Sequence, residues 1–233
     1  MRAATFGQDL EFLRQHVEVV LLQDKAGQAQ VAVVPAYQGR VMTSTAGGPK
    51  APSYGWINRR LIASGKREPH INIYGGEDRF WLGPEGGQFS IFFAGGTPFD
   101  LDHWYTPPPI DTEPFEVTHV ADDRVVCHRQ FALTNYSNAQ FDVAVTREVR
   151  LVSPRELLAE MGVSLGTGVK AIGFESINSV KNAGGSAWRP ESGLLSIWIL
   201  GMLNASPKTT VVVPVRQGPE SELGPLVNDA YFG

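Results

Sequence analysis

The chain has 233 residues, of which 42% are hydrophobic and 19% charged, and its formal net charge is -4. These fractions are typical of a globular protein, and so small a negative charge excludes the long-range field that would gather nucleic acid or an anionic membrane surface. The single cysteine, Cys127, rules out an intrachain disulfide and a cysteine-rich zinc site, and no apolar signal-peptide core follows Met1, so we expect a cytoplasmic protein.

The N-terminal part of the chain predicts one short helix followed by three strands. Apolar residues at helical spacing, with acids in the first turn, predict an amphipathic helix over residues 8–15. Residues 17–24 and 29–35 have the composition of two strands joined by a glycine-containing turn, which is typical of a hairpin. A third strand is predicted over residues 39–45.

The middle of the chain alternates apolar and polar residues with period two. A helical turn or an irregular segment is expected over residues 56–64, and a strand over 88–93. Residues 115–120, 124–133 and 140–152 continue in the same alternation, with short polar turns between them. This pattern predicts an antiparallel meander.

Toward the C-terminus, weak helical character over residues 156–161 precedes three further predicted strands, at 172–180, 194–203 and 208–215. The longest apolar run is the one at 194–203. It is about half of the ~20 residues that a membrane-spanning helix needs, so we expect no membrane partner.

These elements favour an all-β protein. Many strands of medium length, with 16 prolines and 25 glycines in the chain, predict a large antiparallel sandwich with one or two short helices. No repeat or linker divides the chain, so residues 1–233 are interpreted as a single domain. The chain stops abruptly at Asp229–Gly233, without a closing strand, and we expect part of the fold to be lacking there.

The segment 69–93 combines carboxylates, an arginine, aromatic rings and five glycines before a predicted strand. Carboxylates and guanidinium groups can hydrogen-bond the hydroxyls of a sugar, aromatic faces can cover its C–H face, and glycines allow close backbone approach. An ion pair that fixes a long loop, with a tryptophan as core anchor, is the competing interpretation. The candidate substrate-binding residues in this segment are His70, Asn72, Arg79, Trp81 and Glu85.

Two further candidates lie on predicted strands. Arg147 shares its parity with the valines of residues 140–152, so its guanidinium is expected on an apolar sheet face, where it needs a partner. A buried ion pair is the favoured interpretation, and direct contact with a ligand is the other. Asn178 lies in a later segment, 173–188, that again mixes a carboxylate, amides, glycines and a tryptophan, and its amide could meet sugar hydroxyls.

The candidate acid and base are His103 and Glu175. Acidic neighbours of His103 can hold its tautomer and favour general-acid chemistry, although a solvated loop histidine is the alternative interpretation. Glu175 could act as a general base, or it could hydrogen-bond the loop backbone. The five histidines show no metal-ligand spacing, so no metal site is expected.

The chain resembles an uncharacterised bacterial family of the galactose mutarotase-like superfamily. The resemblance covers most of the chain and rests on four segments: residues 39–45, 75–87, 145–151 and 174–182. It implies a β-supersandwich fold, and members of this kind usually run longer past the Tyr231–Gly233 region. Aldose epimerases of this superfamily use a histidine as general acid and a late glutamate as general base, and His103 and Glu175 are the nearest candidates by chain order.

The sequence therefore predicts a carbohydrate-binding protein that needs no cofactor and takes a monosaccharide or a terminal sugar, with aldose 1-epimerase-like acid and base chemistry as the reaction to test. One alternative is a sugar-binding protein without catalysis. Another is a lyase-like enzyme that processes a polysaccharide, with Arg129 and Arg147 holding a uronate carboxylate.

Overall fold

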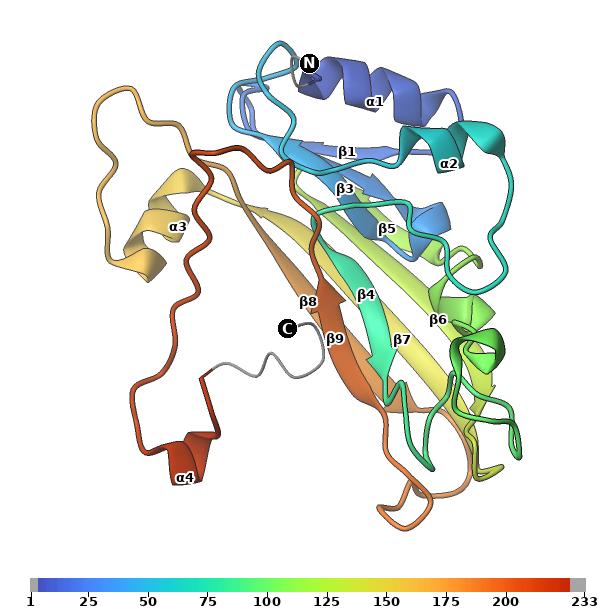
Figure 1. Cartoon of the computed structure of the whole chain (residues 1–233). Helices are drawn as coiled ribbons and strands as arrows, with labels where there is room; N and C mark the ends of the chain where they lie inside the picture. The colour runs from blue at the N-terminus through green and yellow to red at the C-terminus, as the bar shows by residue number, and fades with distance from the viewer. Residues whose placement is uncertain (1–3, 227–233) are drawn as a thin grey trace.

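The computed structural model describes residues 4–226 and consists mainly of β-structure, with a few short helices (Figure 1). Its strands form three antiparallel sheets, in the orders β1-β2-β3, β4-β9 and β5-β6-β7-β8. This confirms the all-β expectation. The interpretation of residues 1–233 as one domain stays a prediction, and the abrupt segment Asp229–Gly233 lies outside the described residues.

The two faces of the first sheet pack against different parts of the molecule. Along its central strand, Val31 and Val33 face the core between the sheets, whereas Ala32 and Val34 face the helices on the other side. A register shift between Ala32 and Val33 marks a β-bulge, which bends the strand. The three strands are β1 (Val20–Gln23), β2 (Gln30–Val34) and β3 (Arg40–Thr45).

The four-stranded sheet has the meander order that its period-two alternation predicts. Neighbouring strands pair over long stretches, with Arg124 opposite Arg150 at one end of the β6–β7 ladder and Thr134 opposite Gln140 at the other. The outer face of the sheet is polar and its inner face is apolar, as expected for a half-buried antiparallel sheet. The strands are β5 (Glu116–Ala121), β6 (Arg124–Thr134), β7 (Gln140–Val152) and β8 (Gly173–Asn182).

The remaining two-stranded sheet joins β4 (Arg79–Gly83) to β9 (Ser196–Leu200), with Trp81 opposite Trp198. An isolated bridge between Val41 and Asp78 connects β4 to β3. Every residue of β4 is buried. Figure 1 shows β4 and β9 in front of the four-stranded sheet, so the molecule is layered as a sandwich around its main core.

The main core lies between these layers and draws apolar side chains from both. Cys127, on β6, is 1% exposed within it, and burial raises the pKa of its thiol to about 11. A second cluster fills the space between the other face of the first sheet and two helices, α1 (Phe6–Arg14) and α2 (Arg59–Ser64). Helix α1 starts at a capping box in which Thr5 and Gln8 bond each other's backbone amides.

Short helical pieces complete the architecture. They are η1 (Pro35–Tyr37), η2 (Leu101–His103), η3 (Pro108–Ile110), α3 (Pro154–Met161) and α4 (Glu220–Leu223). None of the helices within residues 4–226 is both long enough and apolar enough to cross a membrane.

Two predicted strands are wrong. Residues 88–93 form a turn followed by bends, and Ile91, Phe92 and Phe93 are all buried there without pairing to a strand among the described residues. Residues 208–215 have no strand partner among the described residues, and Val211, Val212 and Val213 are 73–80% exposed. A β-branched run favours a strand only where a neighbouring strand completes its hydrogen bonds.

Candidate functional site

A cleft of about 550 Å³ lies at one end of the sandwich, where two loops meet the β6–β7 turn. Its walls come from residues 91–97, 103–109 and 132–138. The first loop packs closely on the turn, because a Cβ added at Gly95 would come within 2.9 Å of the carbonyl oxygen of Tyr136. The volume is in the range of small-molecule pockets.

The aromatic wall of the cleft is formed by Tyr105, which is 48% exposed. Its ring stacks on that of His70 with centroids 4.3 Å apart. Nδ1 of His70 donates to the carbonyl of Trp104 at 2.6 Å, and the backbone amide of Tyr105 donates to the carbonyl of Phe92 at 2.9 Å. These bonds fix an exposed aromatic face that a ligand could cover.

His103 lines the same cleft from η2 and is tied to Asp100. The carboxylate of Asp100 accepts from the backbone amide of His103 at 3.1 Å and from its Nδ1 at 2.5 Å. The hydrogen bond from the imidazole holds the pKa of Asp100 below its usual value. Because the Nδ1–H of His103 donates to Asp100, Nε2 is the ring nitrogen that can hydrogen-bond a ligand or water.

One polar group in the cleft wall lacks a partner. Thr106 is buried, and its hydroxyl has no hydrogen-bond partner within residues 4–226. Asn138 at the opposite wall adopts a left-handed conformation with φ of 62°, at the turn between β6 and β7. The cleft thus combines an aromatic face with hydroxyl, amide and imidazole groups.

A row of stacked groups lies directly beneath the cleft. The guanidinium of Arg79 lies 4.2 Å from the ring centroid of Trp81, whose ring contacts Phe92 at 5.3 Å. Phe92 in turn stacks on Trp104 at 5.1 Å. Nε1 of Trp81 donates to Glu85 at 2.6 Å. Arg79 and Trp81 are each 2% exposed, so they support the cleft floor rather than lie open to a ligand.

Asp111 connects this row to the cleft wall. Its carboxylate accepts from Arg79 at 2.9 Å and from the side-chain amide of Asn72 at 2.8 Å. Asp111 directly follows η3, whose first residue, Pro108, lines the cleft. Burial lowers the pKa of Arg79 to about 10, and the Asp111 carboxylate opposes that shift.

The other two predicted binding residues belong to a separate buried network. Arg147 pairs with the carboxylate of Asp78 and donates to the carbonyl of Gly39 at 2.9 Å and to Asn178 at 2.7 Å. Arg147 is fully buried. This is the ion pair that the parity of β7 predicts. Ser176 also donates to Asp78, at 2.9 Å, so Arg147 and Asn178 belong to this network and do not line the cleft.

Glu175 lies far from His103. Glu175 faces outward on β8, where it pairs with Arg150 at 2.5 Å, and it is opposite Arg150 in the ladder. The cleft contacts Leu133, which is opposite Phe141 at the other end of β7. Nine residues of extended strand separate those two points, roughly 30 Å. His103 and Glu175 therefore cannot act on one sugar ring in this arrangement.

Sequence reasoning missed Tyr105 and Thr106 as cleft residues, whereas it expected an acidic neighbour to hold the imidazole of His103, and that neighbour is Asp100. The available signal was the run Trp104–Pro109, where aromatic residues precede three prolines that stiffen the backbone. Asp111, which joins Asn72 to Arg79, gave no local signal because its partners lie more than thirty residues earlier.

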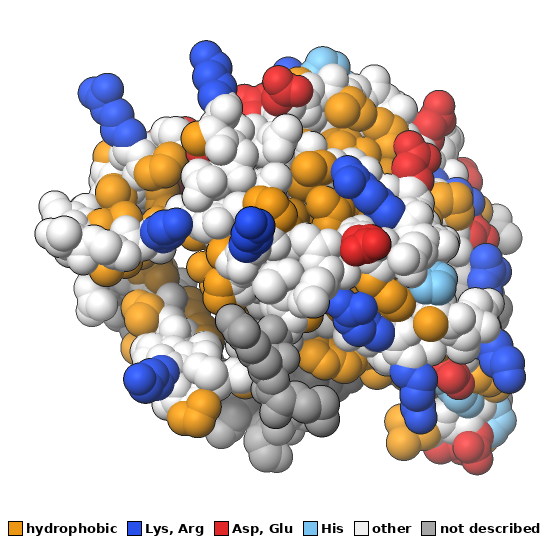
Figure 2. Space-filling model, turned by 90° about the horizontal axis from the view of Figure 1, so that it is seen from above, with side chains coloured by type: hydrophobic (Ala, Val, Ile, Leu, Met, Phe, Trp, Pro, Cys, Tyr) orange, Lys and Arg blue, Asp and Glu red, His pale blue; other side chains and the backbone are white. Residues whose placement is uncertain are grey.

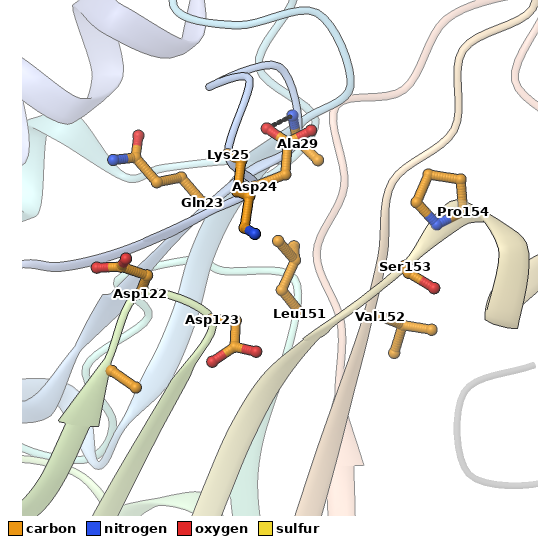
Figure 3. A pocket seen from close by; sticks show the side chains of 11 residues that line it. Gln23, Asp24, Lys25, Ala29, Asp122, Asp123, Leu151, Val152, Ser153 and Pro154 are labelled. Atoms are coloured by element: carbon orange, nitrogen blue, oxygen red, sulfur yellow. Dashed lines mark hydrogen bonds between the residues drawn. The ribbon is translucent and has the colours of Figure 1, made fainter.

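A second hollow, of about 640 Å³, lies where the β1–β2 turn meets the β5–β6 turn and the start of α3 (Figure 3). Its carboxylates are spread out, and Asp122 and Asp123 point in different directions in Figure 3. Asp24 accepts from the backbone amides of Gln28 and Ala29 and so holds its own turn.

Within residues 4–226, no group of three or more His, Cys, Asp or Glu side chains could hold a metal ion.

Glu77, a largely buried acid outside the cleft, is expected to make stability depend on pH. Burial raises the pKa of Glu77 to about 7, against the opposing hydrogen bonds from Ser44. Because the folded-state pKa is the higher one, the stabilising contribution is complete below about pH 4.5 and is lost as pH rises through 7. We expect the free energy of unfolding to fall by up to about 3 kcal/mol over that interval.

Urea unfolding at several pH values measures this effect. In Glu77→Gln the fall should largely disappear, whereas in Glu68→Gln, an exposed acid with the same change of charge, it should persist. Equal pH profiles for the two variants would contradict the assignment to Glu77.

The fold and site together define an all-β sandwich protein with an aromatic cleft supported by a buried arginine and tryptophan. The chain belongs to the family of unknown function DUF6786, whose family model matches residues 4–233. Comparison with the curated proteins and with the solved structures gave no significant match.

Proposed function

We propose that the chain is a carbohydrate-binding protein that holds a monosaccharide or a terminal sugar in the cleft beside Tyr105. The observation that carries this proposal is the ring of Tyr105, which stacks on His70 and lines the same cleft as the Asp100-bound imidazole of His103. An aromatic face can cover the C–H groups of a pyranose, and the surrounding imidazole, hydroxyl and amide groups can bond its hydroxyls.

The buried residues beneath the cleft support the same proposal in a different way. Arg79 and Trp81, with Asn72 and Asp111, fix the position of the loops that carry Phe92 and Tyr105. A fixed cleft loses less conformational entropy on binding than a mobile one, which favours affinity for a small neutral ligand. The two-layer antiparallel arrangement is in keeping with a galactose mutarotase-like β-supersandwich, which we propose as the finer fold class.

The proposal is tested by titrating the protein with a panel of neutral hexoses and following amide shifts by NMR. Tyr105→Ala is expected to weaken binding at least about tenfold, because it removes the exposed face on which the sugar stacks. Tyr54→Ala is the matched control, since Tyr54 is a tyrosine of similar exposure outside the cleft lining. If the two variants bind sugar equally well, the sugar does not bind beside Tyr105.

Aldose 1-epimerase-like proton transfer is a second candidate function, and the Asp100–His103 pair favours it. Ring opening needs an acid and a base at one sugar, and Glu175 is too distant to be that base. Polarimetry of freshly dissolved α-anomers distinguishes the two functions. Equilibration that outpaces buffer with wild type but not with His103→Asn supports catalysis, whereas binding without acceleration supports a binding protein.

No observation favours the lyase-like alternative. Arg147 pairs with Asp78, and Arg129 pairs with Glu113 and donates to the carbonyl of Pro114 at 2.7 Å. Both guanidinium groups are therefore engaged by the protein itself and are not available to hold the carboxylate of a uronate.

A further inference from the structure

A small hollow of about 240 Å³ lies beside the end of α2, away from the sugar cleft. Its floor includes Tyr37 and Tyr74, whose rings stack with centroids 4.0 Å apart. Its rim includes the residues that follow α2, and α1 contributes through the turn after its last residue. Figure 2 views the molecule from the side of α1 and α2, where basic side chains project from the surface.

The lining of this hollow is positively charged. His16, Lys66 and Arg67 belong to it, and no aspartate or glutamate does. The C-terminus of α2, which carries a partial negative charge, is partly satisfied within the chain. The carbonyl of Leu61 accepts from Ser64 Oγ at 2.7 Å, and that of Ile62 accepts from the amide of Gly65 at 3.2 Å.

Behind the two tyrosines lies a buried cation without a carboxylate of its own. Arg40 is 0% exposed, and its side chain donates to the carbonyl of Gly75 at 3.0 Å and to the side-chain oxygen of Gln38 at 3.4 Å. Its Nε has no hydrogen-bond partner among residues 4–226. Its guanidinium carbon lies 5.9 Å and 5.6 Å from the ring centroids of Tyr37 and Tyr74.

The nearby carboxylate does not neutralise this cation. Asp111 is already bonded to Arg79, so this carboxylate is shared between two buried guanidinium groups. Burial lowers the pKa of Arg40, and the proximity of Arg79 lowers it further. A buried positive charge in excess is costly unless an anion compensates it, and the open side of the tyrosine pair is where an anion could enter.

The tyrosines themselves can donate hydrogen bonds to such an anion. Burial raises the pKa of Tyr37 to about 12 and also raises that of Tyr74, so both phenols keep their protons at neutral pH. Arg67 adds an exposed guanidinium whose one hydrogen bond, to the carbonyl of Thr112, is long at 3.5 Å. That side chain can turn toward a ligand at little cost.

We propose that this hollow, which we call the tyrosine pocket, binds a tetrahedral oxyanion of the phosphate class. Lys66 and Arg67 supply the charged donors, the phenols of Tyr37 and Tyr74 supply neutral ones, and the buried charge of Arg40 favours the anion from behind. The proposal is independent of sugar binding, because the cleft beside Tyr105 shares no lining residue with the tyrosine pocket.

The test uses inorganic phosphate as the probe and follows binding by calorimetry and by thermal unfolding at constant ionic strength. Wild type is expected to bind phosphate and to unfold at a higher temperature in phosphate than in chloride. Arg67→Gln should weaken binding at least about tenfold, because it removes a charge-assisted hydrogen bond. Arg60→Gln is the matched control, since it removes the same charge from α2 at an exposed position outside the pocket lining.

Two further variants keep the outcome interpretable. Tyr37→Phe retains the stacked ring and removes only the phenol, so it should fold normally and bind phosphate more weakly. Tyr105→Ala should bind phosphate as wild type does, even if it loses sugar binding. The proposal is overturned if phosphate does not bind wild type at millimolar concentration, or if Arg67→Gln and Arg60→Gln weaken binding equally, which indicates general charge screening.

Discussion

Replacing Arg147 with glutamine is expected to lower the free energy of unfolding by about 3 to 5 kcal/mol, one of the two largest single-site effects that we expect in this chain. Arg147 is fully buried between the layers, and its removal leaves the carboxylate of Asp78 in the core without its cation. The carbonyl of Gly39 and the amide oxygen of Asn178 lose their donor in the same change.

The measurement is urea unfolding followed by circular dichroism and tryptophan fluorescence. Arg150→Gln is the matched control on the same strand, because Arg150 pairs with two acids at the surface, where solvent screens the interaction. Arg150→Gln should lower the free energy of unfolding by much less than Arg147→Gln does. If the two variants lose equal stability, the buried pair contributes no more than a surface pair.

A double variant separates the buried charge from the packing. When Asp78 is changed to asparagine together with Arg147→Met, no unpaired charge remains in the core, and a large part of the lost stability should return. Without such recovery, the loss in Arg147→Gln would be attributed to poorer packing instead.

Trp81→Ala is expected to destabilise the protein by about 3 to 5 kcal/mol, because it opens a cavity in the core between the layers. The indole is 2% exposed and contacts both Arg79 and Phe92. Denaturant unfolding measures the change, with Trp56→Ala as the control. Trp56 is 38% exposed, so its truncation should cost far less.

The same residue links stability to the cleft, and Trp81→Phe examines that link. Phenylalanine keeps most of the apolar volume but loses the hydrogen bond to Glu85 and part of the contact with Phe92. This variant should stay folded while binding sugar more weakly. Unchanged sugar affinity in a folded Trp81→Phe protein would show that the row beneath the cleft does not position it.

Periodicity predicted most of the strands because each has one face on the core and one face toward solvent. Along β7 the alternation is regular enough to place Arg147 on the buried face, and the structure has it there. Helix α1 was predicted at residues 8–15, and the structure has it at Phe6–Arg14, where the Thr5 cap sets its start.

The strand signal failed where both faces of a segment are buried. β4 has five buried residues in succession, so it shows no alternation, and its charged neighbours made it resemble a turn. The apolar run over residues 88–93 was mistaken for the strand of this region. Its side chains instead fill the space below the cleft as an irregular loop.

The candidate site could be predicted only in part for a similar reason. The segment 69–93 does supply His70, Asn72, Arg79, Trp81 and Glu85 to one connected region. Composition could not tell which of them face a ligand, because that depends on the loop after residue 93 that covers them. The pairing of His103 with Glu175 rested on chain order, which carries no information about distance across a sheet.

The burial of Cys127 gives the chain a built-in reporter of its own opening. It is the single cysteine of the sequence, it is 1% exposed between the layers, and its thiol has a pKa of about 11. At neutral pH a thiol reagent therefore reacts with Cys127 only after the two layers of the sandwich have moved apart and exposed the thiol. The rate of labelling at this one atom follows the opening of the core in wild-type protein and in every variant proposed above, with no engineered label.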